Sequence, residues 1–496
     1  MNHDFDVVVL GGGIVGSAIA MGLATKGHSV VLVERGSQAI DDQIEAKPLI
    51  KCTGRMHTGC VRARNHVLGG NGHYWGGGLM RPRDLGVFDC LGISEMPDKE
   101  SDSLSNHFRN VEELLGVRRA PSRAPVSVND SAIGPCHLAE ICVLPGKNRN
   151  TSRYLLERFQ QMPRCEIITG AEVETFSSRH GQNISSVTVN HQGKPREVTG
   201  RTFVIATGAI DSNLMVLAHA KEFGLERSAD LGHGLHDHLS LPIARVRLSP
   251  RSKDLLALRF RNGLIVGRHF ELKCGSGWGA GGFLHFPFQF DKVSPYRELR
   301  QVMLLQQQGA PAVELVKASL PFLSIIPRLF RVGMERVLKQ RLYLSDDLVI
   351  CATLDFETFP HPENALRLTG DCAEFAWNIR DQDELSYLEL LDKANRLVTE
   401  LASTQGMVIE PLADFSSRTA AIDYLYTAAT DAFHLGGGLA AGHSGLAVVD
   451  RNLLLCGTEN VYVISSAVLQ RSGVVNPTHT LLALADRFVN TYRGEA

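Results

Sequence analysis

The N-terminal region of the chain reads Asp6-Val7-Val8-Val9-Leu10-Gly11-Gly12-Gly13-Ile14-Val15-Gly16. The apolar run predicts a buried strand, and the glycines predict a sharp turn into a helix from about Ile14 to Thr25. In such a turn one glycine lets the backbone fold back, a second lets main-chain N–H groups approach a pyrophosphate, and a third lets helix and strand pack closely. The candidates for these roles are Gly11, Gly13 and Gly16.

A second apolar run, Val30-Val31-Leu32-Val33, ends at Glu34, 18 residues beyond the last glycine of the turn. At the end of a second strand, Glu34 is placed to accept hydrogen bonds from the hydroxyls of an adenosine ribose. The start of the helix, at Ile14 and Val15, carries a positive partial charge that would face the phosphates. The sequence therefore predicts a dinucleotide site with Arg35 at its edge, and FAD and NAD share this fingerprint. The alternative is a glycine-rich turn that binds no ligand.

The composition limits the class of protein. The chain has 496 residues, of which 44% are hydrophobic, and a formal net charge of −2. This length predicts two or three domains, and the charge gives no whole-chain reason to expect nucleic-acid or membrane-surface binding. Because no apolar run of about 18 residues is present and the first strand begins too early for a signal peptide, we expect a soluble cytoplasmic protein. The ten cysteines form no C-x-x-C pair, which favours reduced thiols over a zinc site or disulfides.

A second glycine-rich segment occupies residues 68–78, where six of eleven residues are glycine around a single tryptophan. Glycine permits a backbone with positive φ, which can lie flat against a planar ligand. One interpretation is a loop that touches a cofactor ring, and the other is a surface loop whose tryptophan packs on the body of the protein. The candidate ligand contacts in this loop are Gly70, Asn71, Gly72, His73 and Trp75.

Two later segments complete the predicted nucleotide-binding sheet. Residues 164–173 suit one strand whose main chain at Val173 could meet the adenine, and residues 201–209 suit an apolar strand that enters a turn at Thr207 and Gly208. That turn either approaches the nucleotide or simply connects strand and helix. Residues from about 240 to 425 show mixed strands and helices without nucleotide signals, so we expect a second domain on the substrate side.

Within this second part, residues 312–343 combine apolar residues with six basic and two acidic ones. A basic amphipathic pattern can lie on a membrane or on a partner protein. The alternatives are a helical hairpin packed on the body with its charges in solvent, a lid, and an oligomer contact.

Near the C-terminus, His434-Leu435-Gly436-Gly437 is followed 42 residues later by Asn476-Pro477-Thr478. His434 and Asn476 are polar residues able to accept, or to hydrogen-bond, the hydroxyl proton of an alcohol beside the dinucleotide. Taken singly, the histidine could be a core residue and the asparagine a helix cap.

Together these segments resemble the glucose–methanol–choline (GMC) flavin oxidoreductases over nearly the whole chain. Besides the N-terminal turn, five blocks carry the resemblance in the family's order: Gly69-Gly70…Trp75-Gly76-Gly77; Ala206 to Ser212; Gly232 to His238, similar to G-x-x-L-x-D-H; Glu357 to Asn364, similar to E-x-x-P-x-P-x-N; and Gly445 to Arg487, similar to the C-terminal signature.

The resemblance implies FAD as the cofactor and an α/β fold of p-hydroxybenzoate-hydroxylase-like architecture. A discontinuous Rossmann-like FAD-binding domain would comprise residues 1–90, 145–240 and 426–496. An α+β substrate domain with an antiparallel sheet would comprise residues 91–144 and 241–425, with 312–343 as a lid, oligomer or surface helical segment.

The resemblance also implies roles for the C-terminal residues. In the family, a histidine in an H-x-x-G block is followed by a second histidine or an asparagine, and here these are His434 and Asn476, the version seen in sterol and pyranose oxidases. His434 would accept the hydroxyl proton while hydride passes to flavin N5, and Asn476 would orient the hydroxyl and the developing alkoxide. A helix opened by Pro477 and Thr478 would present its N-terminus to the pyrimidine side of the flavin.

Some departures limit the placement within the family. Pyranose oxidases carry FAD covalently on a histidine just before the loop's tryptophan, where this chain has Tyr74, with His73 one position earlier, so we expect noncovalent FAD. The usual D-A-S near the pyrophosphate reads Ser465-Ser466-Ala467, with Ser466 as a candidate contact, and the arginine of the G-T-x-R-M stretch is absent. The polar residues of the G-x-x-L-x-D-H block are expected to be structural, with no metal site.

The leading functional hypothesis is oxidation of a primary or secondary CH–OH to the carbonyl on a sugar, glycoside, cyclitol or similar polyol. The alternatives are a lipid or sterol alcohol, which the apolar 312–343 segment favours, and a flavin-containing lyase resembling the family's hydroxynitrile lyases. The expected partners are a small-molecule alcohol and O₂ or another electron acceptor, with no nucleic acid and no transmembrane segment; the oligomeric state is open.

Overall fold

The structure is a computed structural model, and it describes fifteen stretches of the chain. These are residues 3–38, 49–82, 91, 104–117, 123–125, 136–144, 146–262, 264–275, 278–288, 295–307, 311–320, 322–345, 348–370, 372–442 and 447–494. The predicted domain boundaries at residues 90 and 145 lie outside the described residues, so the division into domains stays a prediction.

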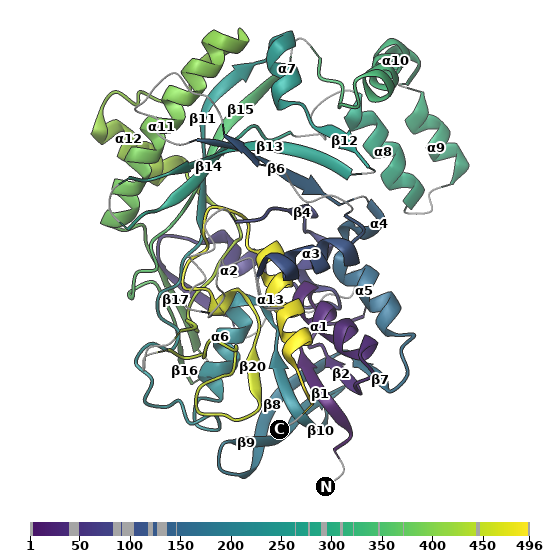
Figure 1. Cartoon of the computed structure of the whole chain (residues 1–496), viewed down its shortest axis with the longest axis vertical. Helices are drawn as coiled ribbons and strands as arrows, with labels where there is room; N and C mark the ends of the chain where they lie inside the picture. The colour runs from purple at the N-terminus through teal and green to yellow at the C-terminus, as the bar shows by residue number, and fades with distance from the viewer. Residues whose placement is uncertain are drawn as a thin grey trace.

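A parallel sheet forms the half of the molecule that contains both described chain ends (Figure 1). Five of its strands run parallel in the order β7-β2-β1-β10-β20, and β10 also pairs antiparallel with β9, which pairs with β8. The strands are β1 (Phe5–Leu10), β2 (Val30–Val33), β7 (Cys165–Ile168), β8 (Ala171–His180), β9 (Asn183–His191), β10 (Lys194–Ile205) and β20 (Val461–Val463). The apolar runs of β1 and β2 are buried on both sides, as expected for central parallel strands.

The prediction of one strand over residues 164–173 is wrong. The chain breaks after β7 because Gly170 adopts a φ of +63°, and β8 then leaves the parallel layer to pair with β9. Strand β10 is also longer than predicted. Its first half, residues 194–199, pairs with β9, whereas its second half pairs with β1 and β20. One strand therefore belongs to both the parallel layer and an antiparallel extension.

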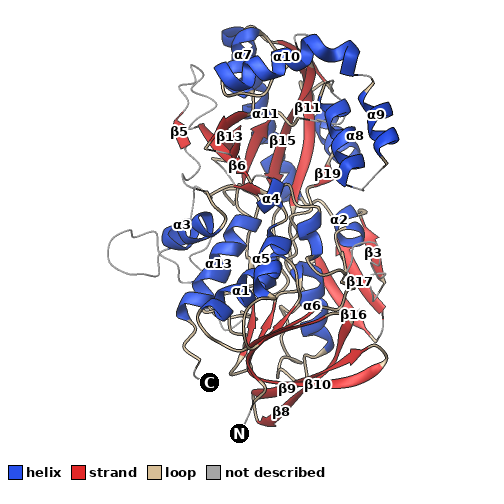
Figure 2. Cartoon of the chain, turned by 90° about the vertical axis from the view of Figure 1, so that its right-hand side faces the viewer, coloured by secondary structure: helices blue, strands red, loops and turns tan. Residues whose placement is uncertain are grey.

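Helix α1 (Ile14–Thr25) spans the predicted residues and packs against α5 (Thr151–Phe159) and α13 (Thr478–Thr491) (Figure 2). Helix α13 in turn contacts α3 (Leu104–Leu114). The remaining helices of this half are α2 (Thr58–Arg62), α4 (Gly146–Arg149) and α6 (Gly208–Ala218), with the 3₁₀ turns η2 (Gly70–His73) and η5 (Ser466–Val468).

An antiparallel sheet forms the other half, in the order β18-β11-β15-β14-β13-β6-β4, with β12, β19 and β5 paired at its sides. Its strands are β4 (Gly78–Leu79), β5 (Arg123–Pro125), β6 (His137–Val143), β11 (His238–Arg247), β12 (Arg259–Arg261), β13 (Leu264–Lys273), β14 (Gly281–His285), β15 (Val349–Glu357), β18 (Val408–Pro411) and β19 (Thr430–Asp431). A third, small sheet consists of β16 (Ala365–Thr369), β17 (Cys372–Trp377) and β3 (Ile50–Gly54). The other helices are α7 (Pro250–Leu256), α8 (Tyr296–Gln307), α9 (Ala312–Ser319), α10 (Phe322–Leu338), α11 (Asp381–Gln405) and α12 (Arg418–Ala428).

The two faces of the antiparallel sheet differ in polarity. Leu239 and Leu241 of β11 belong to the apolar cluster that this sheet forms with buried residues of α11. Side chains alternate along a strand, so His238 and Ser240 face the opposite side. By strand register, that side also carries His269, Glu271, His285, Thr353, Asp355 and Glu357. A polar face of the sheet is therefore turned away from the α11 core.

The predicted fold class is confirmed: an α/β protein in which a Rossmann-like parallel sheet is assembled from separate parts of the chain and accompanies an antiparallel sheet. Among the helices that the structure describes, none combines the length and the apolar character needed to cross a membrane.

Candidate active site

A cavity of about 320 Å³ lies at the carboxyl ends of the parallel strands. Residues that directly follow β1, β2, β10 and β20 line it: Gly11, Glu34, Ala206, Thr207, Ile464 and Ser465. In open α/β sheets this edge is where ligands bind, because loops from neighbouring strands converge there. The cavity therefore lies where the glycine turn predicted a dinucleotide.

The glycine turn fits a pyrophosphate. Gly11 adopts a φ of +102°, and a Cβ on it would lie 2.7 Å from the Ala206 carbonyl oxygen. A Cβ on Gly16 would lie 1.9 Å from the Gly11 oxygen, so a larger residue cannot occupy this helix–strand contact. Gly13, by contrast, lines the cavity, and no atom of the described residues lies within 4 Å of where its Cβ would be. The first helical N–H groups have no partner within the helix, which leaves them available to an anion beside Gly13.

Glu34 is buried at the cavity wall, where each of its carboxylate oxygens accepts one backbone hydrogen bond. The Gly12 N–H donates to Oε2 and the Gly36 N–H donates to Oε1, both at 2.7 Å. Burial raises the pKa of Glu34, and these two amide hydrogen bonds offset part of that rise. A carboxylate oxygen can accept more than one hydrogen bond, so Glu34 keeps the capacity to accept ribose hydroxyls.

Sequence reasoning missed an ionic cluster in the same cavity. Arg64 donates to Asp211 at 2.7 Å, and His66 Nε2 lies 3.4 Å from the same carboxylate. Burial opposes ionisation of Asp211, but the hydrogen bond from His66 and the charge and hydrogen bond of Arg64 outweigh it, and the pKa is lowered to about 2. The signal in the sequence was the position of Arg64 and His66 directly before the glycine loop.

The glycine loop of residues 68–78 contributes to the cavity with only part of its length. It joins the N-terminal turn through a hydrogen bond from the Gly69 N–H to the Gly12 oxygen. Gly70 and Asn71 line the cavity, whereas Trp75 packs beside α1 against an apolar cluster. His73 uses both ring nitrogens: Nε2 lies 2.8 Å from the Leu68 oxygen, and Nδ1 accepts from the side-chain amide of Asn150 at 3.0 Å.

Most of the predicted cofactor residues come together at this cavity. Those that line it are Gly11, Gly13, Ile14, Val15, Glu34, Arg35, Gly70, Asn71, Val173, Thr207, Gly208, Ser466 and Thr478. Those that do not are Gly16, Gly72, His73, Trp75, Asn476 and Pro477.

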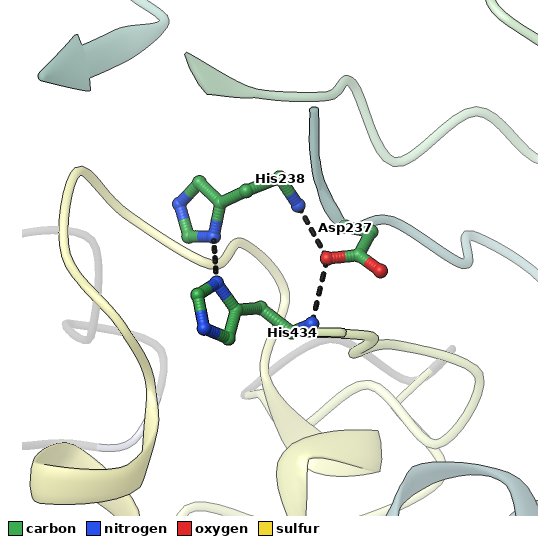
Figure 3. Close-up of side chains that lie close together, drawn as sticks. All are labelled: Asp237, His238 and His434. Atoms are coloured by element: carbon green, nitrogen blue, oxygen red, sulfur yellow. Dashed lines mark hydrogen bonds between the residues drawn. The ribbon is translucent and has the colours of Figure 1, made fainter. Parts of the chain in front are cut away.

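His434 belongs to a cluster of polar side chains at the start of β11 (Figure 3). Asp237 Oδ1 accepts hydrogen bonds from the backbone N–H groups of His238, at 2.6 Å, and of His434, at 2.8 Å. The rings of His238 and His434 meet through their Nδ1 atoms at 3.2 Å. Phe433, directly before His434, adopts a φ of +62°, a strained conformation for a bulky residue that the Asp237 contact helps to hold.

The hydrogen bonds of His238 fix the tautomer of His434. His238 Nε2 lies 2.7 Å from the Gly473 carbonyl oxygen, which can only accept, so this nitrogen carries the proton. In the neutral ring His238 Nδ1 is then an acceptor, and the bridging proton belongs to His434 Nδ1. His434 Nε2 is left unprotonated, and it makes no hydrogen bond with another described residue.

The electrostatic setting keeps His434 neutral. Burial lowers its pKa to about 4, and the neighbouring His238 acts in the same direction, against smaller opposing effects of Asp237 and Asp355. Burial raises the pKa of Asp237, but its contact with His57, whose Nε2 lies 3.0 Å from Asp237 Oδ2, outweighs it and the pKa falls. The arrangement thus pairs a neutral imidazole with an ionised carboxylate that holds its backbone.

Most of the candidate ligand atoms near His434 already make hydrogen bonds or an ion-pair contact within the protein. Asp237 and the two histidines lie close enough together to hold a cation, and so do His57, Asp237 and Asp431. Asp431, however, accepts the backbone N–H groups of Thr58 and Gly59. The carboxylates of Asp237 and Asp431 accept hydrogen bonds from backbone N–H groups, and the rings of His238 and His434 hydrogen-bond to each other. This region therefore fits a hydrogen-bonding network better than a metal site.

The segment around Asn476 contacts the same region through its neighbouring residues. Its neighbour Val475 clusters with Met80 and with Phe283, which lies on the polar face of the sheet, and Gly473 holds His238. The Asn476 Oδ1 atom is buried without a hydrogen-bond partner in the described chain. Two residues further on, Thr478 begins α13 and lines the cofactor cavity, with Pro477 as the N-cap. His238 thus joins the segments that carry His434 and Asn476.

Comparisons with known proteins agree with these observations. Residues 360–485 match a family model described as GMC oxidoreductase, and residues 6–42 match one described as FAD dependent oxidoreductase. No curated protein matches the sequence. Among solved structures, pyridoxine 4-oxidase from Mesorbium loti is 15% identical, with a TM-score of 0.58 over 98% of this chain and 99% of the other. A formate oxidase from Aspergillus oryzae, altered to study FAD modification, is 13% identical, with a TM-score of 0.60 over 98% and 97%.

The fold, the glycine turn and the two family matches define the class of protein: it is an FAD-dependent oxidoreductase. Within that class, the match of the C-terminal region confirms the resemblance to the GMC oxidoreductases that the sequence blocks predicted. At these identities the solved structures establish the fold, and it extends over almost the whole chain.

Proposed function

We propose that this protein oxidises a CH–OH group to a carbonyl, with His434 Nε2 as the acceptor of the hydroxyl proton. The observation that carries the proposal is the hydrogen-bond chain from the Gly473 oxygen through His238 to His434, which leaves Nε2 neutral and unprotonated. When bound, FAD supplies the acceptor for the hydride that leaves the same carbon. The alcohol thus loses one proton and one hydride, which balances the conversion to the carbonyl.

Asn476 is proposed to orient the substrate hydroxyl. Its Oδ1 is buried with no partner among the described residues, so a donor from a bound ligand would satisfy it. Its NH₂ group can donate to an oxygen on which negative charge develops as the proton leaves.

The polar face of the antiparallel sheet favours a polyhydroxylated substrate, such as a sugar, glycoside or cyclitol. This face begins at His238, next to His434, and continues over Ser240, Asp355 and His285. Burial raises the pKa of Asp355, but the charge and hydrogen bond of His285 outweigh it, so the carboxylate stays ionised. An ionised acceptor beside hydroxyl and imidazole groups suits several substrate hydroxyls, whereas a sterol or alkyl chain on this face would leave these polar groups without hydrogen-bond partners.

We propose that FAD is held without a covalent bond. Both ring nitrogens of His73, the histidine of the glycine loop, are occupied by protein hydrogen bonds. Acid denaturation of the purified protein should therefore release FAD into the supernatant. A flavin that stays with the precipitate would contradict this part of the proposal.

The decisive experiment is the visible spectrum of the holoenzyme before and after anaerobic addition of sugars, cyclitols, sterols and simple alcohols. We expect the flavin to bleach with a member of the sugar or cyclitol group. Bleaching only with sterols would show that the substrate is a sterol and not a polyol. Turnover of a cyanohydrin without bleaching would show that the protein is a lyase and not an oxidoreductase of alcohols. Reoxidation of the bleached enzyme by O₂, compared with an artificial quinone, then identifies the class of electron acceptor.

A further inference from the structure

Helices α9 and α10 lie at the end of the molecule opposite to the two termini (Figure 1, Figure 2). No side chain of α9 is buried. Among the described residues, eight of the seventeen exposed large apolar side chains fall within residues 313–338. They are Val313, Val316, Leu320, Ile326, Phe330, Met334, Val337 and Leu338, with Phe330 69% and Val337 74% exposed. An exposed patch of this kind on a folded protein marks an interaction surface.

The spacing of these residues forms one stripe on each helix. On α9 and its C-terminal cap they recur at three and four residues, from Val313 to Leu320, and on α10 they recur at four, four and three, from Ile326 to Val337. Side chains at these intervals lie on one helix face. The stripe is fixed to the body of the protein, because Ile325 is buried and the Arg336 guanidinium lies 3.4 Å from the centre of the Phe260 ring.

The same segment is strongly basic. Residues 312–343 carry six lysines and arginines against two glutamates, whereas the whole chain has a net charge of −2. Beside α10 lies a second cavity of about 340 Å³, whose described lining includes Lys253, Arg331, Lys339 and Arg341. Glu335 is the acidic residue among that described lining, and it pairs with Lys339 and Arg341, so four cationic side chains there face one carboxylate. Met334 belongs both to this cavity and to the apolar stripe, so the cationic cavity adjoins the exposed apolar surface.

We propose that this surface, formed by α9, α10 and the cationic cavity beside them, binds to anionic lipid membranes. An apolar stripe flanked by lysine and arginine matches the boundary between acyl chains and anionic headgroups. In this arrangement the stripe enters the boundary region and the cavity receives a lipid phosphate. A second copy of the chain fits less well, because a twofold contact through this face would bring two basic segments together. The proposal does not depend on the assignment of His434.

The test is flotation of the purified full-length holoenzyme with phosphatidylcholine vesicles that contain or lack phosphatidylglycerol. We expect flotation with the anionic vesicles alone, and we expect it to weaken as salt is raised. The double variant Phe330→Glu/Val337→Glu should float at least tenfold less, since two exposed apolar anchors become acidic. Lys317→Glu should weaken flotation by about fivefold or more, because each basic residue near an anionic surface contributes about that factor.

Leu385→Glu, at another exposed apolar position, on α11, is the matched control and should float like the parent protein. The flavin spectrum and circular dichroism of every variant show that it has folded. Absence of flotation at low salt, or equal flotation of the double variant, would overturn the proposal. The proposal would also be overturned if the parent protein is a dimer in solution that does not bind vesicles and the double variant is a monomer.

Discussion

The two parts of the candidate site are built in different ways. The cofactor cavity centres on one contiguous segment, Gly11 to Gly16, whose turn folds back on itself at Gly16 and lies against the end of the neighbouring strand at Ala206. The cluster around His434 is assembled from remote segments: Asp237 and His238 contact a residue 197 and 196 positions further along the chain. The first part therefore depends mainly on the backbone geometry of one short turn and its contact with the adjacent strand, and the second on how the antiparallel sheet meets the C-terminal loops.

This difference has a functional consequence. Cofactor retention should depend on the local turn and Glu34, whereas the chemistry should depend on the tertiary contacts of His434. Variants in the two parts should therefore separate the two properties, and the degree of separation can be measured.

The largest effect is expected from His434→Ala. With the proton acceptor removed, turnover of the alcohol should fall by about 10²- to 10⁴-fold, the range typical of general bases. The flavin content should stay at the parental level, because His434 does not line the cofactor cavity. Anaerobic stopped-flow reduction of the flavin measures the chemical step directly.

His361→Ala, near the surface and outside the site, is the control for the loss of a histidine. If flavin reduction in His434→Ala proceeds at the parental rate, His434 is not the proton acceptor. If FAD is lost together with activity, the two parts of the site are not separable.

His238→Phe should give the next largest effect. The substitution removes the acceptor for the His434 Nδ1 proton, so that proton can move to Nε2 and block it. We expect turnover to fall by about 10- to 100-fold, by analogy with residues that orient a metal-bound histidine. His238→Asn, which can keep an oxygen acceptor near the place of Nδ1, should recover part of the loss. Equal activity of the two variants would show that His238 only fills space.

The sequence predicts the glycine turn better than it predicts the contacts between remote segments. The helix at Ile14–Thr25 and the placement of Glu34 at the cavity were predicted, because a glycine turn between an apolar strand and a helix has few alternative geometries. The break at Gly170 was missed because an apolar run can continue through a glycine or turn at it, and pairing with β9 decides between them. The residues His434 and Asn476 were proposed from the family resemblance. The protonation of His434 could not be predicted, since it depends on a carbonyl oxygen at Gly473 and on burial.

A smaller effect, on the cofactor part alone, is expected from Glu34→Ala. The variant loses the carboxylate that accepts the Gly12 and Gly36 N–H groups and that we expect to bind the ribose. FAD affinity should weaken by about tenfold, the equivalent of roughly one to two lost hydrogen bonds. Equilibrium dialysis with FAD measures it, and Glu174→Ala on the exposed side of β8 is the control. The fraction that still holds FAD should reduce its flavin at nearly the parental rate, and a large drop in that rate would remove the distinction between the two parts.

The smallest effect concerns pH, and it tests the environment of His434 without changing any residue. A base must be neutral to accept a proton, so activity falls as pH drops through the pKa of the histidine. An unperturbed histidine, with a pKa of about 6.5, would be only about one-tenth neutral near pH 5.5. Because burial and the neighbouring His238 lower the pKa of His434 to about 4, kcat/KM should change less than twofold between neutral pH and about pH 5.5.

Circular dichroism at each pH separates loss of activity from unfolding. Acid promotes unfolding because a histidine that is buried and neutral in the folded protein binds a proton more readily in the unfolded chain. If kcat/KM instead halves near pH 6.5 in the folded holoenzyme, the tertiary contacts around His434 do not set its protonation. The two parts of the site would then still differ in how they are assembled, but the remote contacts of His434 would not be what tunes its pKa.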